Sequence, residues 1–125
     1  MNVVDSSAWL EYFADGPNAG EFADIVADAG NLLVPSITLF EVFKRIRAQR
    51  DSEVALRAVA QMKRGEVINL DGDLAIMAAE LSAELRLPLA DSVILATARS
   101  AGATLWTQDS DFKGLDAVEY RAHRG

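Results

Sequence analysis

The sequence contains no cysteine and only one histidine, His123. The absence of cysteine excludes disulfide bonds and thiolate metal sites, so a metal ion would have to be bound by oxygen atoms or by this histidine. Oxygen ligands favour hard cations such as Mg²⁺ or Mn²⁺. We expect no catalytic role for His123, because it lies in a polar stretch between Ala122 and Arg124.

Long apolar runs are also missing. No run approaches the ~20 residues that a membrane span needs, and the N-terminal residues lack the basic and apolar regions of a secretory signal. We therefore expect a cytoplasmic protein that does not enter a membrane. Its 125 residues, 50% hydrophobic and 25% charged, have the composition of an ordinary globular protein and predict one domain over residues 1–125.

Basic residues are scarce, with 12 Lys and Arg against 19 Asp and Glu and a formal net charge of −7. Such a balance argues against nucleic-acid binding, which depends on Lys and Arg contacts to phosphates. The distribution weakens that argument, because seven of the twelve lie between positions 44 and 64: Lys44, Arg45, Arg47, Arg50, Arg57, Lys63 and Arg64. This basic segment is either a solvated face of two helices or a surface for a polyanion.

Short β-branched or aliphatic runs alternate with longer stretches of helical spacing. This alternation predicts an α/β fold with a parallel sheet covered on both faces. The expected strands are residues 3–4, 32–34, 67–70 and 104–106. The expected helices are about 6–14, 19–29, 36–50, 51–64, 74–85 and 89–102. We expect Ser36 to cap the third helix and Asp71 or Asp73 to cap the fifth, and residues 122–125 to form a loose tail.

Four acidic residues lie close to strand ends or helix starts. Asp5 follows the first strand and Asp109 lies just past the last, while Asp91 lies in the first turn of its helix and Glu41 in about the second turn of another. Ligands of open α/β sheets gather at the carboxyl ends of the strands, so these side chains are expected to share one cleft. Carboxylates gathered in this way repel one another unless a divalent cation neutralises them. The pattern therefore predicts a Mg²⁺ or Mn²⁺ site.

Each of these acids also has a purely structural explanation. Asp5 and Asp91 are favourable at helix N-termini, and Asp109 can form local hydrogen bonds in a turn. Glu41 has the spacing for a surface ion pair with Lys44 or Arg45. Its apolar neighbours oppose that explanation, since they place Glu41 near a buried face where an unpaired charge is costly.

At these residues the sequence resembles the PIN-domain nucleases, and within them the VapC-type toxins of toxin–antitoxin pairs. The resemblance extends from Val3 to Phe112, and its matching segments are residues 3–8, 40–42, 89–98 and 107–112. Each segment alone is weakly specific, but their order and spacing are specific. The resemblance implies a three-layer α/β/α sandwich around a short, mostly parallel sheet. It also implies a Mg²⁺- or Mn²⁺-dependent endoribonuclease that cleaves structured RNA.

The resemblance also implies roles for individual residues. Those that match the acidic quartet of the family, expected to be catalytic, are Asp5, Glu41, Asp91 and Asp109. We expect Asp5 and Asp91 to bind the ion, Asp109 to complete the site, and Glu41 to hold water molecules or a second ion. Asp111 could share or take over the role of Asp109. The small hydroxyl residue Ser6 and the polar Thr107 are expected to support the acids beside them.

The VapC resemblance implies partners as well as a substrate. A VapB-type antitoxin would hold the enzyme inactive, by a helix in an apolar groove or by a basic side chain among the carboxylates. A homodimer is also expected. The aromatic residues that could belong to such contacts, or simply to the core, are Trp9, Tyr12, Phe13, Phe40 and Phe43.

Two other functions fit parts of the sequence. A PIN fold could serve as a binding module without cleavage, although the presence of all four acids argues against this. A receiver-type phospho-acceptor domain would use Asp71 after the third strand as its acceptor. That second alternative lacks support, because a receiver has an acidic pair after its first strand and a lysine after its last, where this chain has Asp5-Ser6 and Gln108-Asp109.

Overall fold

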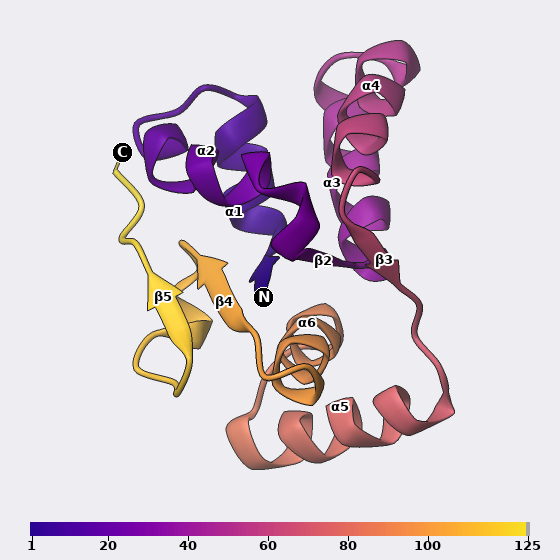
Figure 1. The fold of residues 1–125 in the computed structure, drawn as a ribbon, viewed down its shortest axis with the longest axis vertical. Coiled ribbons are helices and arrows are strands. Elements are labelled where there is room, and N and C mark those ends of the chain that lie inside the picture. The colour runs from indigo at the N-terminus through magenta and orange to yellow at the C-terminus, as the bar shows by residue number, and fades with distance from the viewer. Residues whose placement is uncertain (125) are drawn as a thin grey trace.

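The computed structural model describes residues 1–124, whose five strands form one parallel sheet (Figure 1). The strands are β1 (Asn2–Val4), β2 (Leu32–Pro35), β3 (Glu66–Ile68), β4 (Thr104–Thr107) and β5 (Val118–Tyr120). Their order is β3-β2-β1-β4-β5, so β1 is central, with Val3 opposite Leu33 on one side and opposite Leu105 on the other. Because every pairing is parallel, the carboxyl ends of all these strands meet at the same edge.

Helices cover both faces of the sheet, as Figure 1 shows, with α5 and α6 on one side and α1 to α4 on the other. The bounds are α1 (Ser6–Phe13), α2 (Ala19–Ala27), α3 (Ser36–Gln49), α4 (Ser52–Met62), α5 (Gly72–Leu85) and α6 (Leu89–Ser100). Short 3₁₀ helices, η1 (Ala29–Asn31) and η2 (Ser110–Phe112), precede β2 and follow β4.

Consecutive residues of β1 pack into different cores, as the alternation of side chains along a strand requires. Val3 belongs to the apolar cluster under α5 and α6, which includes Ile94 and Leu105. Val4 belongs to the cluster under α1 to α4, which includes Trp9 and Val42. Both valines are fully buried. The chain therefore has the predicted three-layer α/β/α sandwich.

The four strands expected from the apolar runs are confirmed, but β5 was not predicted. It has three residues, lies at the edge of the sheet and pairs only with β4, where Leu105 faces Val118 and Thr107 faces Tyr120. The tail was expected to be loose, and for residues 122–124 this is wrong. The carbonyl of Ala122 accepts a hydrogen bond from Asn18 at 2.9 Å, and Arg124 Nε donates to Asn18 Oδ1 at 2.7 Å. Gly125 lies outside the described residues.

The helix starts show which candidate caps are used. Asp71, not Asp73, caps α5, because its Oδ1 accepts a hydrogen bond from the backbone N–H of Leu74 at 2.8 Å. The prediction that Ser36 caps α3 is wrong. Ser36 is already the first helical residue and Pro35 precedes it, so the serine does not occupy the capping position. None of the helices within residues 1–124 has the length and apolarity of a membrane-spanning segment.

Candidate active site

A pocket of about 500 Å³ is lined by all four acids singled out in the sequence, Asp5, Glu41, Asp91 and Asp109. β1 ends at Val4 and β4 at Thr107, so the sheet delivers Asp5 and Asp109 to the same edge, where Val4 pairs with Trp106. The first turn of α6 contributes Asp91, and the second turn of α3 contributes Glu41. Four separate chain segments thus converge on one pocket.

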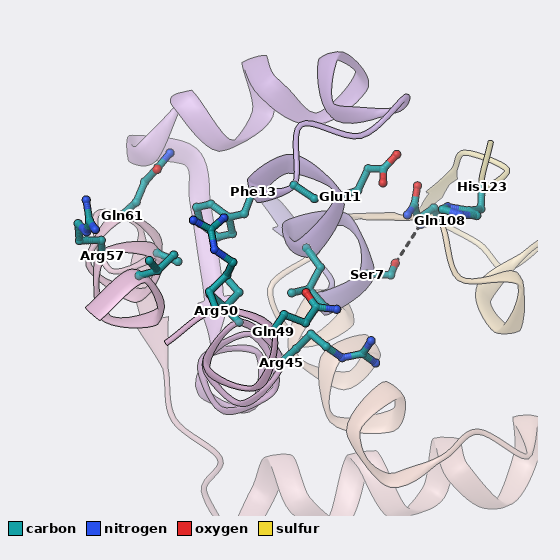
Figure 2. Close-up of a pocket in the computed structure, with 15 residues that line it drawn as sticks. Ser7, Glu11, Phe13, Arg45, Gln49, Arg50, Arg57, Gln61, Gln108 and His123 are labelled. Carbon is teal, nitrogen blue, oxygen red and sulfur yellow. Dashed lines mark hydrogen bonds between the residues drawn. The ribbon is translucent and has the colours of Figure 1, made fainter. Parts of the chain in front are cut away.

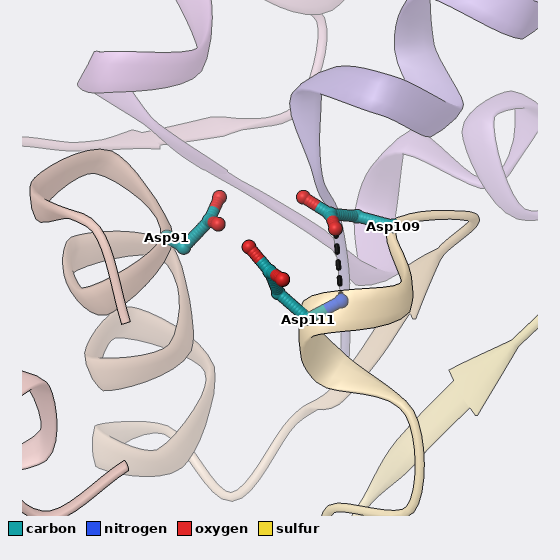
Figure 3. Close-up of side chains that lie close together, drawn as sticks. All are labelled: Asp91, Asp109 and Asp111. Carbon is teal, nitrogen blue, oxygen red and sulfur yellow. Dashed lines mark hydrogen bonds between the residues drawn. The ribbon is translucent and has the colours of Figure 1, made fainter. Parts of the chain in front are cut away.

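Two of these acids, Asp91 and Asp109, form a cluster with Asp111, shown in Figure 3. One carboxylate oxygen of each lies within 4.8 Å of the others. Asp91 projects from α6 towards the two acids of the loop after β4, and the N–H of Asp111 donates to Asp109 Oδ1 at 2.9 Å. No ion pair within residues 1–124 involves any of the three. This all-oxygen set, without a cationic side chain to neutralise it, fits a hard divalent cation.

Asp5 is only 2% exposed and serves two structural purposes. Its Oδ1 accepts hydrogen bonds from Ser7 Oγ at 2.8 Å and from the N–H of Ala8 at 2.9 Å, so it caps α1. Its Oδ2 accepts a hydrogen bond from Thr107 Oγ1 at 2.6 Å. Burial raises the pKa of Asp5 to about 6, the three hydrogen bonds oppose this rise, and the charge of Asp109 adds to it. The helix-cap explanation of Asp5 therefore holds alongside its place in the pocket.

Asp91 shows the electrostatic cost of gathering these acids. Its pKa is raised to about 7, first by burial and then by the negative charges of Asp109, Asp5, Asp111 and Glu41. The carboxylates therefore act on one another as a single electrostatic group. A bound cation would remove the repulsive part of this shift.

Glu41 is held by a hydroxyl group and not by the ion pair that its helical spacing allows. Ser6 Oγ donates to Glu41 Oε1 at 2.6 Å, across 35 positions of sequence. Lys44 and Arg45 line the same pocket, yet neither is among the ion pairs formed by the part of the chain that the structure describes. Ser6 was expected to support Asp5, the acid beside it, but its hydroxyl contacts Glu41, and Ser7 is the serine that donates to Asp5.

Thr107, the last residue of β4, contacts two of the pocket acids, Asp5 and Asp109. Besides donating to Asp5, its hydroxyl oxygen accepts a hydrogen bond from the N–H of Asp109 at 2.9 Å. Thr107 itself is fully buried. The one hydroxyl group thereby links two pocket acids that are more than a hundred positions apart in the sequence.

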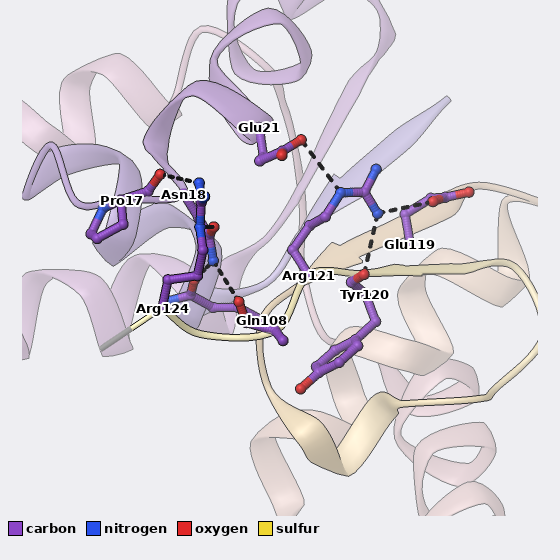
Figure 4. A network of polar contacts seen from close by, with 9 residues as sticks. Pro17, Asn18, Glu21, Gln108, Glu119, Tyr120, Arg121 and Arg124 are labelled. Atoms are coloured by element: carbon purple, nitrogen blue, oxygen red, sulfur yellow. Dashed lines mark hydrogen bonds and ion pairs between the residues drawn. The ribbon is translucent and has the colours of Figure 1, made fainter.

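Polar contacts that the sequence did not reveal tie the loop after β4 to the rest of the molecule (Figure 4). Asn18, which is 2% exposed, donates through Nδ2 to Gln108 Oε1 at 3.0 Å, and its Oδ1 accepts from Arg124. The N–H of Gln108 donates to Ser7 Oγ at 3.2 Å, and Ser7 in turn donates to Asp5. Asn18 in a turn after Gly16-Pro17 signals only a turn, because the partners of its side chain lie about 90 or more residues away.

A larger pocket of about 710 Å³ lies beside the carboxylate pocket (Figure 2). The two share Ser7, Leu10 and Arg45 in their linings. Arg50 and Arg57 also line the larger pocket, so part of the basic segment faces this space. His123 lines it too, and is absent from the lining of the carboxylate pocket.

The aromatic residues differ in burial, and Tyr12, Phe13 and Phe43 are partly buried against the core cluster that contains Trp9. Trp9 is 1% exposed and stacks on Phe13 with ring centroids 5.6 Å apart, so core packing accounts for it. Phe40 is 61% exposed and lines the carboxylate pocket. Core packing therefore does not account for Phe40.

Several solved structures resemble this fold over nearly the whole chain. A toxin–antitoxin complex from Klebsiella pneumoniae contains a chain with a TM-score of 0.81 and 24% identity, covering 95% of this chain and 96% of that one. VapC20 of Mycobacterium tuberculosis, described as a toxin that cleaves the sarcin–ricin loop, has a TM-score of 0.77 and 19% identity, covering 93% and 95%. A DNA-bound VapBC complex from Salmonella typhimurium gives 0.74 and 20%, covering 98% and 97%. Identities this low show a shared fold.

The sequence itself identifies the family. A comparison with curated proteins finds no match. The family model of the PIN domain, however, matches residues 3–118, which include all the acids of the pocket and the whole of β2, β3 and β4. The chain belongs to the PIN domain family.

Proposed function

We propose that this PIN domain is a VapC-type toxin, an endoribonuclease that hydrolyses a phosphodiester bond of structured RNA with Mg²⁺ or Mn²⁺. The observation that carries the proposal is the convergence of Asp5, Glu41, Asp91 and Asp109 on one pocket, with Asp111 beside them. The fold shared with VapC20, which is described as a toxin that cleaves the sarcin–ricin loop, supports the choice of RNA. The receiver alternative loses its basis, since Asp71 caps α5 and lines none of the pockets described above.

We assign different roles to the acidic side chains of the pocket. Asp91 and Asp109, with Asp111, would hold the cation, because one carboxylate oxygen of each lies within 4.8 Å of the others. Asp5 would add a fixed negative charge at the base of the pocket, and Glu41, oriented by Ser6, would hold water molecules or a second ion from the α3 side. When bound, a divalent cation neutralises phosphoryl oxygens and makes water a stronger nucleophile. No histidine is needed in such a site.

The proposal is tested by incubating the purified protein with structured RNAs in Mg²⁺ or Mn²⁺ and, in parallel, with a chelator. Cleavage that depends on the cation and stops with the chelator is the expected result. Equal cleavage in the chelator rejects the metal-dependent mechanism. Absence of cleavage from every RNA, with the protein folded and the cation bound, favours a PIN fold that only binds.

The Thr107 hydroxyl offers a test of how the acids are positioned. Replacing Thr107 by Val keeps the shape of the side chain but leaves Asp5 Oδ2 and the Asp109 N–H without this partner. We expect the cation affinity and the cleavage rate to fall by about 10- to 100-fold, the usual cost of losing an outer partner of a metal ligand. Cation binding is measured by calorimetry with Mn²⁺.

The matched control for this change is Thr97→Val. Thr97 is also buried, but its hydroxyl donates to the Val93 carbonyl within α6, away from the pocket acids. This variant is expected to keep its cation affinity and cleavage rate. Equal cation affinities in the two valine variants would show that Thr107 does not position the acids.

The proposal extends to protein partners, because the similar structures include toxin–antitoxin and VapBC complexes. We propose that a VapB-type antitoxin inhibits this chain by placing a basic side chain among the pocket acids, whose mutual repulsion it would relieve. A structure of the complex without such a contact would contradict this. We also propose that the protein acts as a homodimer in the cytoplasm, and light scattering of the purified protein tests its oligomeric state.

A further inference from the structure

One wall of the carboxylate pocket carries positively charged and aromatic side chains beside the acids. It is formed by α3 and includes Phe40, Lys44 and Arg45, all exposed. Residues four apart lie in one row along a helix, so Phe40 and Lys44 form one row and Glu41 and Arg45 the neighbouring one. An aromatic ring and two cations thus lie next to an acid that faces the proposed reaction site. We call Phe40, Lys44 and Arg45 the α3 lip.

The two cations of the α3 lip are left without acidic partners within residues 1–124. Glu41 has the helical spacing to pair with either of them, but its Oε1 accepts the Ser6 hydroxyl at 2.6 Å. Lys44 instead places Nζ 5.7 Å from the centroid of the Phe40 ring. Four acids alone would repel a polyanion, and two unpaired cations on the facing wall would draw a phosphate backbone towards the pocket.

Phe40 is exposed and belongs to neither of the two core clusters. It is 61% exposed, whereas Val42, two residues along the same helix, is fully buried. Leu56 is similarly exposed, at 59%, but lies on α4 and lines neither of the two pockets described above. Proteins that bind single-stranded nucleic acids stack unpaired bases on exposed aromatic rings and contact the phosphates with nearby cations. Phe40, Lys44 and Arg45 have this combination beside the proposed cleavage site.

We propose that the α3 lip binds the RNA strand next to the bond that is cut. An unpaired base stacks on the Phe40 ring, while Lys44 and Arg45 contact adjacent phosphates. This inference rests on the proposed function, and it names a substrate contact that the acids do not provide. The RNA recognised here is single-stranded at the cleavage point, as in the loop of a hairpin.

A protein occupant fits the α3 lip less well. A largely apolar pocket of about 630 Å³ adjoins the lip, shares Phe40 and Lys44 with it and is otherwise lined by Leu39 and Phe43 among others. This pocket is the better surface for a protein helix. The lip itself faces the carboxylates, and its exposed cations complement a chain of phosphates. A second copy of this chain is the alternative occupant that the experiments must separate from RNA.

The first experiment compares substitutions of Phe40 in cleavage of a hairpin RNA. Phe40→Ala and Phe40→Leu are expected to raise KM about tenfold with a smaller change in kcat, because a stacked base is lost. Phe40→Tyr keeps an aromatic ring and is expected to stay within about twofold of the wild type. Leu retains apolar area without stacking, so it separates the two effects. Leu56→Ala is the control for removing an exposed apolar side chain and is expected to leave KM unchanged.

The second experiment measures binding without cleavage. The Asp91→Asn protein is titrated with a labelled hairpin RNA over a range of salt concentrations, alone and combined with Lys44→Gln or Arg45→Gln. Each added substitution is expected to reduce the slope of log affinity against log salt by about 0.7, the value for one phosphate contact to a single strand. Arg64→Gln belongs to the same basic segment but lines none of the described pockets, so it is expected to leave the slope unchanged.

These outcomes separate the inference from the proposed function. If the wild type cleaves RNA but Phe40→Leu and Phe40→Tyr have equal KM values, and the salt slopes do not change, the α3 lip does not bind the substrate. If Phe40→Ala instead changes the oligomeric state measured by light scattering, and RNA binding is unaffected, the lip is a contact between protein chains. The binding experiment does not need cleavage, so it decides the inference even if the nuclease activity is absent.

Discussion

The Asp91→Asn protein is expected to lose cleavage of structured RNA by more than about 100-fold, because a direct cation ligand should matter more than the outer partners whose loss costs 10- to 100-fold. Asp91 belongs to the cluster in which three carboxylate oxygens lie within 4.8 Å, and it is the acid whose pKa responds to every other acid of the pocket. Asn keeps the size of the side chain but removes its charge. Single-turnover cleavage at saturating Mg²⁺ measures the effect. Asp5→Asn removes a charge beneath the ion and is expected to reduce cleavage by about 10- to 100-fold.

A charge-matched control is available on α2. Asp24 is exposed and lines none of the described pockets, so Asp24→Asn removes one negative charge without touching the site. This variant is expected to cleave RNA at the wild-type rate. Full activity in both Asp91→Asn and Asp5→Asn would reject the assignment of the reaction to this pocket.

The second large effect concerns stability, and its sign is opposite to that of most substitutions. The pKa values of Asp5 and Asp91 are raised from 3.8 to about 6 and about 7, so the folded protein holds these protons more tightly than the unfolded chain. Their contribution to stability is therefore complete below about pH 4 and is lost as the pH rises towards 7. In a chelator at pH 8, Asp91→Asn is expected to melt a few degrees above the wild type, because it relieves repulsion and carries no buried charge.

Addition of Mn²⁺ should reverse the order of the melting temperatures, so that the wild type melts above Asp91→Asn. The cation binds the folded wild type and raises its melting temperature, while Asp91→Asn gains little because it lacks a ligand. Melting curves at pH 8 and at pH 4, with chelator and with Mn²⁺, measure both parts. Asp24→Asn, on an exposed site, should follow the wild type throughout. An Asp91→Asn protein that is less stable than the wild type in chelator at pH 8 would show that the pocket acids are not mutually destabilising.

Strands β1 to β4 could be predicted because each is marked by an apolar run within its own few residues. Apolar runs around Val3, Leu33, Val67 and Leu105 mark the strands, and all four are confirmed. The convergence of Asp5 and Asp109 also followed from the sequence, since residues after parallel strands meet at one edge. β5 was missed because a three-residue edge strand with exposed Glu119 at its centre gives almost no periodic signal.

The partners of the pocket residues could not be predicted, because they depend on contacts between distant segments. Helical spacing indicated an ion pair between Glu41 and Lys44 or Arg45, whereas the acid is bound by Ser6. Nothing near Asn18 in the sequence indicates Gln108 as its partner. The possibility that Asp111 takes part was raised by the family pattern, and its proximity to Asp91 and Asp109 keeps it a candidate ligand.

The parallel sheet has a practical consequence for how the protein is labelled. β1 begins at Asn2, at the edge opposite the pocket, so an affinity tag or fluorophore attached ahead of Met1 leaves the carboxylates accessible. At the other end, Arg124 is hydrogen-bonded to Asn18 and Pro17, and His123 lines the large pocket that adjoins the site. A fusion at that end would disturb the hydrogen bonds of Arg124 and would hinder a large ligand from reaching the site. Immobilisation through the N-terminus is therefore the better choice for binding measurements.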